Sequence, residues 1–494
     1  MRWPNPAWNP DMPAPQERFA KTSRVNKAGS LLHGWCRIAA SEPNELARFN
    51  RELQAALADC GFAVAVQPPL ELTPLILDAN TVRELTRHVR SLCAIFEQVN
   101  RLALSNVAFL RRLEISPSLE GLLRREPETR LGLEFARFDF SPQAGGLRLV
   151  SVSFDTPRGA MLGACLQREY LLHEFSAHSG LARLQPSVFF VALLVDLFMA
   201  VWRERGRPNN NRPNIAILDW REAQPKPGQE LLLEELRARG LEAIRADPRD
   251  FTYRREEQRL YLGKSHIDLV YRSLPVQDIS VRRLPLSAFL DAVADGAVTL
   301  VNGIRARPAC GAAALEVLTS AEFTGFFTAA ENEIKARLLP WTRRLVAGRT
   351  EYLGRDVDLP SFVAQRPERF VIKAGNGMGS DDVSVGALMS REAWLARVEQ
   401  GLRHSEFVQE FVAPTQHSCA HALGLASGRN LLLSAFAVRG EYAGCSAQCS
   451  DDIVIRTQSS SLVPVLEVGG RSKTGPIEAG RPTRKRKPTH TQPN

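Results

Sequence analysis

The sequence feature that most constrains the fold is a series of short apolar segments that alternate with helical patterns between residues 206 and 305. The clearest of these segments are NIAILD at 214–219 and IDLVYR at 267–272. A strand without a polar face is buried on both sides, as in a parallel sheet that helices cover on each face. The pattern therefore predicts a doubly wound α/β domain. It contains no GxGxxG turn, so it does not indicate a dinucleotide site.

The rest of the 494-residue chain divides where its residue pattern changes, and the length predicts several domains. Helical spacing dominates before residue 130 and over 310–350, whereas β-branched and aromatic runs begin at 131. We expect an α/β (α+β) fold with a helical N-terminal layer. The expected segments are a disordered Pro-rich arm (1–30), a helical N-terminal region (31–130), a hairpin followed by helices (131–205), the doubly wound accessory domain (206–305), a lobe with a glycine-bearing flap (306–470) and a basic disordered tail (471–494).

Most of the net charge of +9 lies in residues 471–494, which include the run RKRK at 484–487. The rest of the chain is close to neutral, so we expect no nucleic-acid partner beyond what this tail contacts. The most apolar segment, 188–202, contains Asp196 and is too short to cross a bilayer. It predicts a buried helix and no membrane partner.

Eight cysteines are scattered along the chain without a CxxC pair. This usage indicates neither a disulfide framework nor a zinc ribbon, and it is typical of reduced thiols in a cytoplasmic protein. The N-terminal sequence has no apolar core of the kind found in a secretory signal. The segment HSCAH at 417–421 leaves a structural zinc site open beside its interpretation as a polar loop.

A glycine-bearing loop lies between two short apolar runs, FVIK at 370–373 and the run that begins at Val383. Backbone N–H groups in such a loop can hold phosphate, and a lysine on the preceding strand can reach it. The glycines that allow a tight turn with positive φ are Gly375, Gly377 and Gly379. The unit predicts a phosphate-binding flap, although a simple turn has the same composition.

Acidic, basic and hydroxyl side chains are spaced two residues apart in a predicted hairpin. Arg137 and Asp139 lie in its first strand, and Ser151, Ser153 and Asp155 follow in its second. Alternate residues of a strand share a face. We therefore expect the last three side chains to lie on one face, with Asp139 facing them from the partner strand.

Taken in order, these elements resemble the circularly permuted ATP-grasp family, which includes relatives of the glutathionylspermidine synthetase-type carboxylate–amine ligases. The resemblance covers roughly residues 130–466. The matching elements are Arg137-Phe138-Asp139, Ser151–Pro157, Ile267–Arg272, Pro340-Trp341-Thr342-Arg343, Phe370–Val385 and Phe407-Val408-Gln409-Glu410.

The resemblance implies a circularly permuted ATP-grasp fold with an ATP site between two lobes. It also implies a reaction in which ATP phosphorylates a small-molecule or peptide carboxylate, an amine forms an amide, and ADP and phosphate leave. The implied roles are phosphate contact for Lys373 and the three flap glycines, adenine and ribose contact for Gln409 and Glu410, orientation of anionic oxygens for Arg137 and Arg272, and Mg²⁺ binding for Asp139 with Ser151, Ser153 and Asp155 at the other metal positions.

The chain departs from the family pattern at charged positions. Ser151 and Ser153 stand where the family has Glu and Asn, and Asp381 and Asp382 stand in the phosphate loop. A hydroxyl adds no negative charge to a magnesium site, and two carboxylates repel a triphosphate. Two interpretations stay open. Either Asp155, Asp381 or Asp382 supplies the metal charge of a working ligase, or the chain is a pseudoenzyme that binds a nucleotide or a partner without turnover. Neither the acid, the amine nor the oligomeric state is predicted.

Overall fold

The computed structural model describes most of the chain between residues 27 and 468. The described ranges are 27–62, 70–127, 133–143, 145–187, 190–204, 212–223, 227–374, 383–417, 429–456 and 459–468. The basic tail, the flap loop with its three glycines, and the HSCAH segment after His417 lie outside the described residues. The Pro-rich arm also lies outside them, except for its last residues, which begin helix α1 (Lys27–Ser41).

The central sheet joins two hairpins that are far apart in the sequence. Its strands lie in the order β21-β20-β19-β2-β3, with β18 beside β19. Their bounds are β2 Phe135–Gln143, β3 Gly146–Ser153, β18 Thr415–His417, β19 Arg429–Val438, β20 Glu441–Ser450 and β21 Ser461–Val463. The predicted hairpin is confirmed as β2 and β3, and Asp139 lies between Ser151 and Ser434 in the neighbouring strands.

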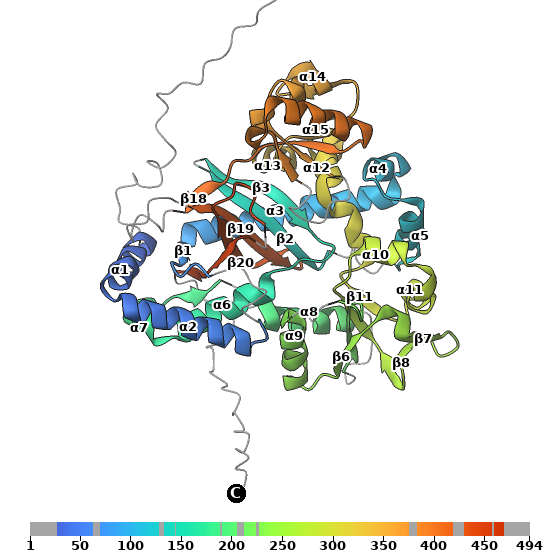
Figure 1. The fold of residues 1–494 in the computed structure, drawn as a ribbon. Coiled ribbons are helices and arrows are strands. Elements are labelled where there is room, and N and C mark those ends of the chain that lie inside the picture. The colour runs from blue at the N-terminus through green and yellow to red at the C-terminus, as the bar shows by residue number, and fades with distance from the viewer. Residues whose placement is uncertain are drawn as a thin grey trace, which may run out of the picture.

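The two faces of this sheet differ in polarity, which determines where polar chemistry can lie. Helix α3 (Ala79–Ser105) runs along the apolar face, where the Phe96 ring lies 6.1 Å from Phe138 and 5.3 Å from Phe154. Figure 1 shows α3 passing behind the strands. Because side chains alternate along a strand, Arg137 and Asp139 of β2 lie on the opposite face.

The predicted parallel sheet is confirmed, with the strand order β11-β10-β5-β6 and parallel pairing throughout. Its elements are β5 Ile215–Leu218, β6 Ala243–Ala246, β10 Leu269–Arg272, β11 Thr299–Val301, α8 Phe190–Glu204, α9 Pro227–Ala238, α10 Val276–Val281 and α11 Ser287–Ala294. Side chains of α8 and α9 cluster with Ile215 and Ile217, whereas those of α11 cluster with Ala216 and Leu218. Both faces are therefore covered, as the apolar pattern predicts.

A second, antiparallel element that the sequence analysis does not predict extends this unit. It consists of β7 (Phe251–Arg254), β8 (Arg259–Leu262) and β9 (Ser265–Ile267). Gly263 joins β8 to β9 with a φ of 61°, a left-handed conformation that glycine adopts without strain. The unit lies at the lower right of Figure 1.

A separate small sheet carries the flap strands and lies at the top of Figure 1 with α14 and α15. Its order is β12-β17-β15-β16, and its core contains the fully buried Trp394. The elements of this lobe, in which β13 and β14 form a hairpin apart from the small sheet, are β12 Thr342–Arg344, β13 Arg349–Tyr352, β14 Arg355–Asp358, α14 Leu359–Ala364, β15 Phe370–Lys373, β16 Val383–Val385, α15 Arg391–Arg403 and β17 Phe407–Glu410. The expectation that 310–350 is mostly helical is confirmed by α12 (Gly311–Thr319) and α13 (Ala329–Leu338). The end of this stretch forms β12 and the start of β13, which the residue pattern does not predict.

The remaining elements surround these three units. The N-terminal helices pack on α6 and α7, where the Phe49 ring stacks on Phe175 at 5.2 Å. A short sheet in the order β1-β22-β4 adjoins them. The bounds are α2 Pro43–Asp59, β1 Leu75–Leu77, α4 Val107–Arg112, α5 Pro117–Arg125, α6 Ala160–Leu172, α7 Glu174–His178, β4 Gln185–Pro186, α12 Gly311–Thr319, α13 Ala329–Leu338 and β22 Val465–Glu467.

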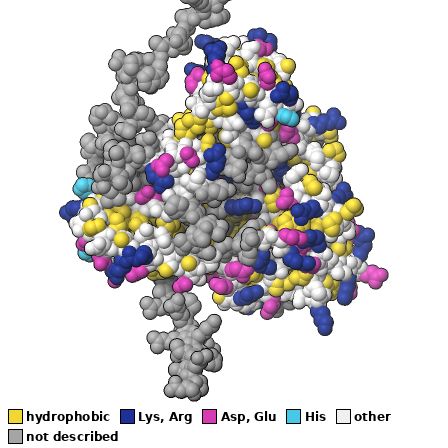
Figure 2. Space-filling model, in the orientation of Figure 1, with side chains coloured by type: hydrophobic (Ala, Val, Ile, Leu, Met, Phe, Trp, Pro, Cys, Tyr) yellow, Lys and Arg dark blue, Asp and Glu magenta, His cyan; other side chains and the backbone are white. Residues whose placement is uncertain are grey.

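The surface carries charges of both signs. Figure 2 shows Lys and Arg side chains interspersed with Asp and Glu on the visible face. This agrees with a body whose charges nearly balance. Among the helices that the structure describes, none combines the length and the apolarity needed to span a bilayer.

Candidate functional site

The polar face of the β2–β3 hairpin centres on the buried carboxylate of Asp139. Ser434 donates from Oγ to Oδ1 at 2.7 Å, and Arg137 donates from Nη2 to Oδ2 at 3.0 Å. Ser151 also donates to Oδ2. The structure thus brings Arg137, Asp139 and Ser151 together as expected. Sequence reasoning missed Ser434, although a lone hydroxyl within the apolar run of β19 is a readable signal.

A β-bulge in this hairpin exposes a backbone acceptor to the small sheet. Asp139 pairs with Ser151 but Phe140 pairs with Leu149, so Val150 is the extra residue and has no partner in the register. A bulge leaves its extra residue outside the ladder. Lys373, the last residue of β15, donates from Nζ to the Val150 carbonyl at 3.2 Å. The ammonium therefore reaches the Asp139 face from the other lobe.

The electrostatics of Lys373 reflect that position. Burial lowers the pKa of Lys373 to about 8, and the Asp139 carboxylate acts in the opposite direction. A cation held beside one carboxylate and a carbonyl, in a partly dry space, is suited to an additional anion such as a phosphate. Ser153, which lies opposite Arg137 in the register, is half-buried at the end of the same face.

The structure does not bring Asp155 to this face. The alternation of side chains ends with β3 at Ser153, and the chain then turns away from the sheet. The Asp155 carboxylate pairs with Arg272 and accepts from the Val276 N–H at 3.1 Å. The expectation that Asp155 shares a face with Ser151 and Ser153 is therefore wrong, because it extends a strand pattern past the end of the strand.

Arg272 likewise has a different role from the one expected. Its side chain is fully buried, and its guanidinium donates to carbonyls of Asn302 (3.1 Å), Gly303 (3.2 Å) and Asp155 (3.1 Å). The Asn302 amide in turn holds the carbonyls of Phe135 and Phe154, each at 2.6 Å. Arg272 thus fastens the α/β unit to the open end of the hairpin, where β2 begins and β3 has just ended. Protein acceptors therefore occupy its guanidinium in this structure.

The two residues expected at the base and ribose differ from each other. Gln409 is buried and donates to the Thr342 hydroxyl at 3.2 Å, so its side chain is already engaged. Glu410 is half-buried and pairs with Arg148 at 3.0 Å across the two lobes, while the Tyr352 hydroxyl donates to it at 3.2 Å. Burial and the Glu410 charge raise the pKa of Tyr352. Of these two side chains, that of Glu410 is the one accessible to a ligand.

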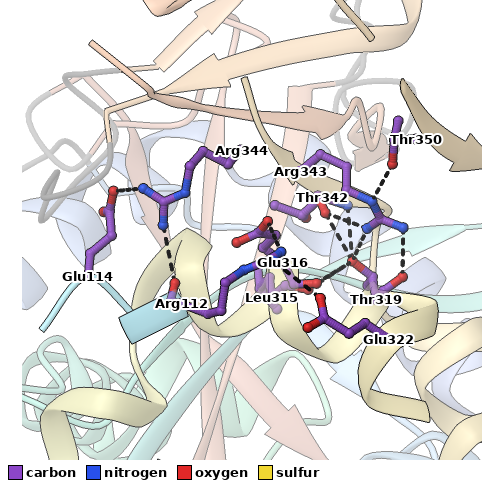
Figure 3. Close-up of polar contacts among 10 residues, drawn as sticks. All are labelled: Arg112, Glu114, Leu315, Glu316, Thr319, Glu322, Thr342, Arg343, Arg344 and Thr350. Atoms are coloured by element: carbon purple, nitrogen blue, oxygen red, sulfur yellow. Dashed lines mark hydrogen bonds and ion pairs between the residues drawn. The ribbon is translucent and has the colours of Figure 1, made fainter. Parts of the chain in front are cut away.

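Figure 3 shows the polar network that joins β12 to the body of the protein. Arg343 donates to the Thr319 carbonyl at 3.0 Å and to the Thr350 hydroxyl at 3.1 Å. Arg344 pairs with Glu114 and donates to the Arg112 carbonyl at 3.1 Å. These contacts fix one edge of the small sheet, and therefore the approach of Lys373 to the hairpin.

A cavity of about 620 Å³ adjoins Glu410. Its wall includes Glu84 and His88 of α3, Arg148 of the hairpin and Arg337 of α13. The His88 ring is buried, and Arg337 approaches its Nε2 at 3.3 Å. Burial, followed by the positive charges of Arg337 and Arg87, lowers the pKa of His88 to about 4. His88 is therefore neutral at pH 7.

We predict that this histidine makes the protein less stable in mild acid. A histidine whose folded-state pKa is depressed favours the unfolded chain once the pH falls below the ordinary value of 6.5. The free energy of unfolding should therefore fall by about 3 kcal/mol between pH 6.5 and pH 4 on account of this group. Urea unfolding at several pH values measures the effect. His88→Gln should make the free energy of unfolding depend less steeply on pH, whereas His178→Gln, at an exposed site, should leave that dependence unchanged.

The described side chains do not fit a magnesium site. Within these ranges, no group of three or more His, Cys, Asp or Glu side chains is placed to hold a metal. Asp139 is the one carboxylate on the polar face of the hairpin, and both its oxygens accept hydrogen bonds from protein donors. Magnesium prefers one or two free carboxylates with water and phosphate oxygens. Asp381 and Asp382 lie outside the described residues.

Comparisons with known proteins support the fold. No family model matches the sequence, and no curated protein matches it. The fold is similar to that of a glutathione synthetase-like effector from Globodera pallida in its apo form, with a TM-score of 0.56 and 11% identity. The match covers 86% of this chain and 98% of the effector. The chain therefore has a mixed α/β fold of the glutathione synthetase-like type.

A second solved structure, a protein assigned as a gamma-glutamylcysteine synthetase from Methylobacillus flagellatus KT, matches with a TM-score of 0.40 and 14% identity. That match covers 75% of this chain and 88% of the other. It is too weak to support an argument about the site.

Proposed function

We propose that this chain is a circularly permuted ATP-grasp-type protein that binds ATP between the β2–β3 hairpin and the small sheet, without magnesium-dependent turnover. The observation that carries the nucleotide proposal is the approach of Lys373 to the Asp139 face from the other lobe. The ammonium would contact the phosphates, with Arg137 beside it. Glu410 would exchange Arg148 for a ribose hydroxyl.

The proposed loss of turnover rests on what surrounds Asp139. Its carboxylate is satisfied by Arg137, Ser151 and Ser434, and Asp155 is committed to Arg272. In a ligase of this type, positive charge must neutralise the phosphoryl group as it moves, and magnesium usually supplies it. Here a lysine and an arginine are the cations near the face. They can hold a phosphate, but they do not bridge two phosphates as a metal does.

Thermal unfolding with ATP tests nucleotide binding. Ligand at 100 times its dissociation constant should stabilise the protein by about 2.7 kcal/mol. We expect the shift with ATP in EDTA to equal the shift with ATP and Mg²⁺. No shift in either buffer would exclude the nucleotide site, and a shift only with Mg²⁺ would show that the flap supplies metal ligands.

Restoring metal ligands should restore metal dependence. Ser151→Glu with Ser153→Asn adds a carboxylate and an amide oxygen where the resembled family has them, so nucleotide binding should strengthen with Mg²⁺ but not in EDTA. Titration calorimetry in both buffers gives the two affinities. Ser118→Glu, which adds the same charge on the exposed start of α5, is the control and should change neither. Equal affinities in the double variant would mean that these positions do not face the phosphates.

The second candidate is an amide-forming carboxylate–amine ligase. It is favoured by the same convergence of Arg137, Asp139 and Lys373, the charged residues to which the resemblance assigns anionic oxygens, the metal and the phosphates. ADP release over pools of carboxylic acids and amines distinguishes the two functions. If the wild type releases more ADP than Lys373→Met does, the protein is a ligase. If it releases no more ADP but still binds ATP, it is the catalytically silent protein.

A further inference from the structure

A pair of cysteines lies away from the nucleotide site, where α2 meets α6. Cys60 caps the C-terminal end of α2 and is half-buried, whereas Cys165 lies on α6 and is buried. Cys60 packs against the apolar cluster that contains Cys165, the interaction between the two thiols shifts the pKa of each, and both are free. A thiol that is partly exposed and next to a second thiol has the arrangement of a redox-active pair.

A cation accompanies this pair. Arg168, one helical turn after Cys165, donates from Nη2 to the Cys60 sulfur at 3.5 Å, and it also pairs with Glu169 at 2.7 Å. The hydrogen bond from Cys165 and the Arg168 charge lower the pKa of Cys60. The same hydrogen bond, together with burial, raises the pKa of Cys165. Thiolate character is therefore concentrated on the sulfur that is partly exposed.

The other cysteines that the structure describes are poorer nucleophiles. All of them are buried, and burial raises the pKa of each one: Cys36, Cys93, Cys310, Cys445 and Cys449. A buried neutral thiol reacts slowly with oxidants. The difference between Cys60 and these residues makes a selective reaction testable within one protein.

We propose that Cys60 is a hydroperoxide-reactive thiol and that Cys165 converts its sulfenic acid into a disulfide that joins α2 to α6. In the first step the Cys60 thiolate attacks one oxygen of hydrogen peroxide. A sulfur–oxygen bond forms, the oxygen–oxygen bond breaks, and the leaving hydroxide takes a proton to become water. In the second step the Cys165 sulfur attacks the Cys60 sulfur, and hydroxide leaves with the Cys165 proton as a second water. Two thiols are oxidised and one peroxide is reduced.

Thiol counting on the full chain tests the proposal, in a Cys419→Ser background because Cys419 lies outside the described residues. Limiting hydrogen peroxide should remove two thiols and lower the intact mass by about 2 Da. Non-reduced peptide mapping should identify the Cys60–Cys165 link. Cys60→Ser should lose no thiols, and Cys165→Ser should accumulate a sulfenic acid on Cys60 that dimedone captures. Cys36→Ser, which changes a buried cysteine of the same helical layer, should behave like its parent.

Arg168→Gln tests the electrostatic part of the proposal. Loss of the guanidinium should slow the peroxide reaction about 3- to 10-fold at pH 7, since the pKa of Cys60 rises and its thiolate fraction falls. The proposal is overturned if another cysteine reacts first, if Cys60→Ser still loses thiols, or if the link joins two chains. Should a serine variant fail to fold, timed alkylation of the unmodified chain with iodoacetamide gives the answer. Cys60 must be labelled first, and equal labelling of all cysteines overturns the proposal.

Discussion

Asp155→Ala is expected to lower the free energy of unfolding by about 3–5 kcal/mol, because it leaves the buried guanidinium of Arg272 without its counter-ion. Arg272 has no access to water, and the carboxylate is the charged member of its set of acceptors. Chemical denaturation of the full chain measures the loss. The fold of the α/β unit against the hairpin depends on this pair, since Arg272 also holds the Asn302 and Gly303 carbonyls.

A double-mutant cycle separates the contribution of the ion pair to the free energy of unfolding from the contribution of the volume that the two side chains fill. Asp155→Leu combined with Arg272→Met removes both charges together, so the double variant should be less destabilised than the sum of its single variants. Arg221→Ala, which breaks an exposed pair with Asp250, is the control and should leave the free energy of unfolding nearly unchanged, because solvent screens that pair. If Asp155→Ala kept full stability but lost magnesium-dependent nucleotide binding, Asp155 would be a metal ligand after all.

The part of the fold that local pattern encodes is predicted well. Ile215–Leu218 is apolar on both faces and Leu269–Arg272 is so up to its final arginine, and that signal needs no knowledge of the rest of the chain. The pairing of β19 with β2 is different, because Ser434 and Asp139 are 295 residues apart and no spacing rule relates them. The β13–β14 hairpin has no readable signal, because its turn places Leu353 as well as Gly354 at positive φ, a conformation that the leucine does not announce.

The site is predicted in the same uneven way. Arg137, Asp139 and Lys373 were expected together because the resemblance places them so, and the structure brings them to one face. The bulge at Val150 and the turn after Ser153 are backbone events that residue identity does not report. The second of these events moves Asp155 out of the predicted metal set. The expectation of a carboxylate pair therefore fails for a geometric reason, whereas the serines at 151 and 153 were readable in the sequence.

Lys373→Met is expected to weaken ATP binding about 10- to 100-fold, the loss of one charge-assisted hydrogen bond of about 1.5–3 kcal/mol. The same change should not lower the free energy of unfolding. Burial of the charged ammonium destabilises the folded protein, as its pKa of about 8 indicates, and methionine removes that charge. Lys335→Met is a matched control. Burial lowers the pKa of Lys335 to about 8 as well, but its Nζ lies 3.8 Å from the centre of the Phe327 ring. Its replacement should leave the affinity unchanged.

The pH dependence of binding gives a second test of the same lysine. Since the pKa of Lys373 in the free protein is about 8, wild-type affinity for ATP should decline as the pH rises above 8 and the ammonium loses its proton. Lys373→Arg keeps its charge at these pH values, so it should bind ATP without that decline. Titration calorimetry from pH 7 to pH 9.5 compares the ATP affinities of the wild type and of Lys373→Arg. A wild-type affinity that is constant over this range, with Lys373→Met binding equally well, would remove the lysine from the site and the nucleotide proposal with it.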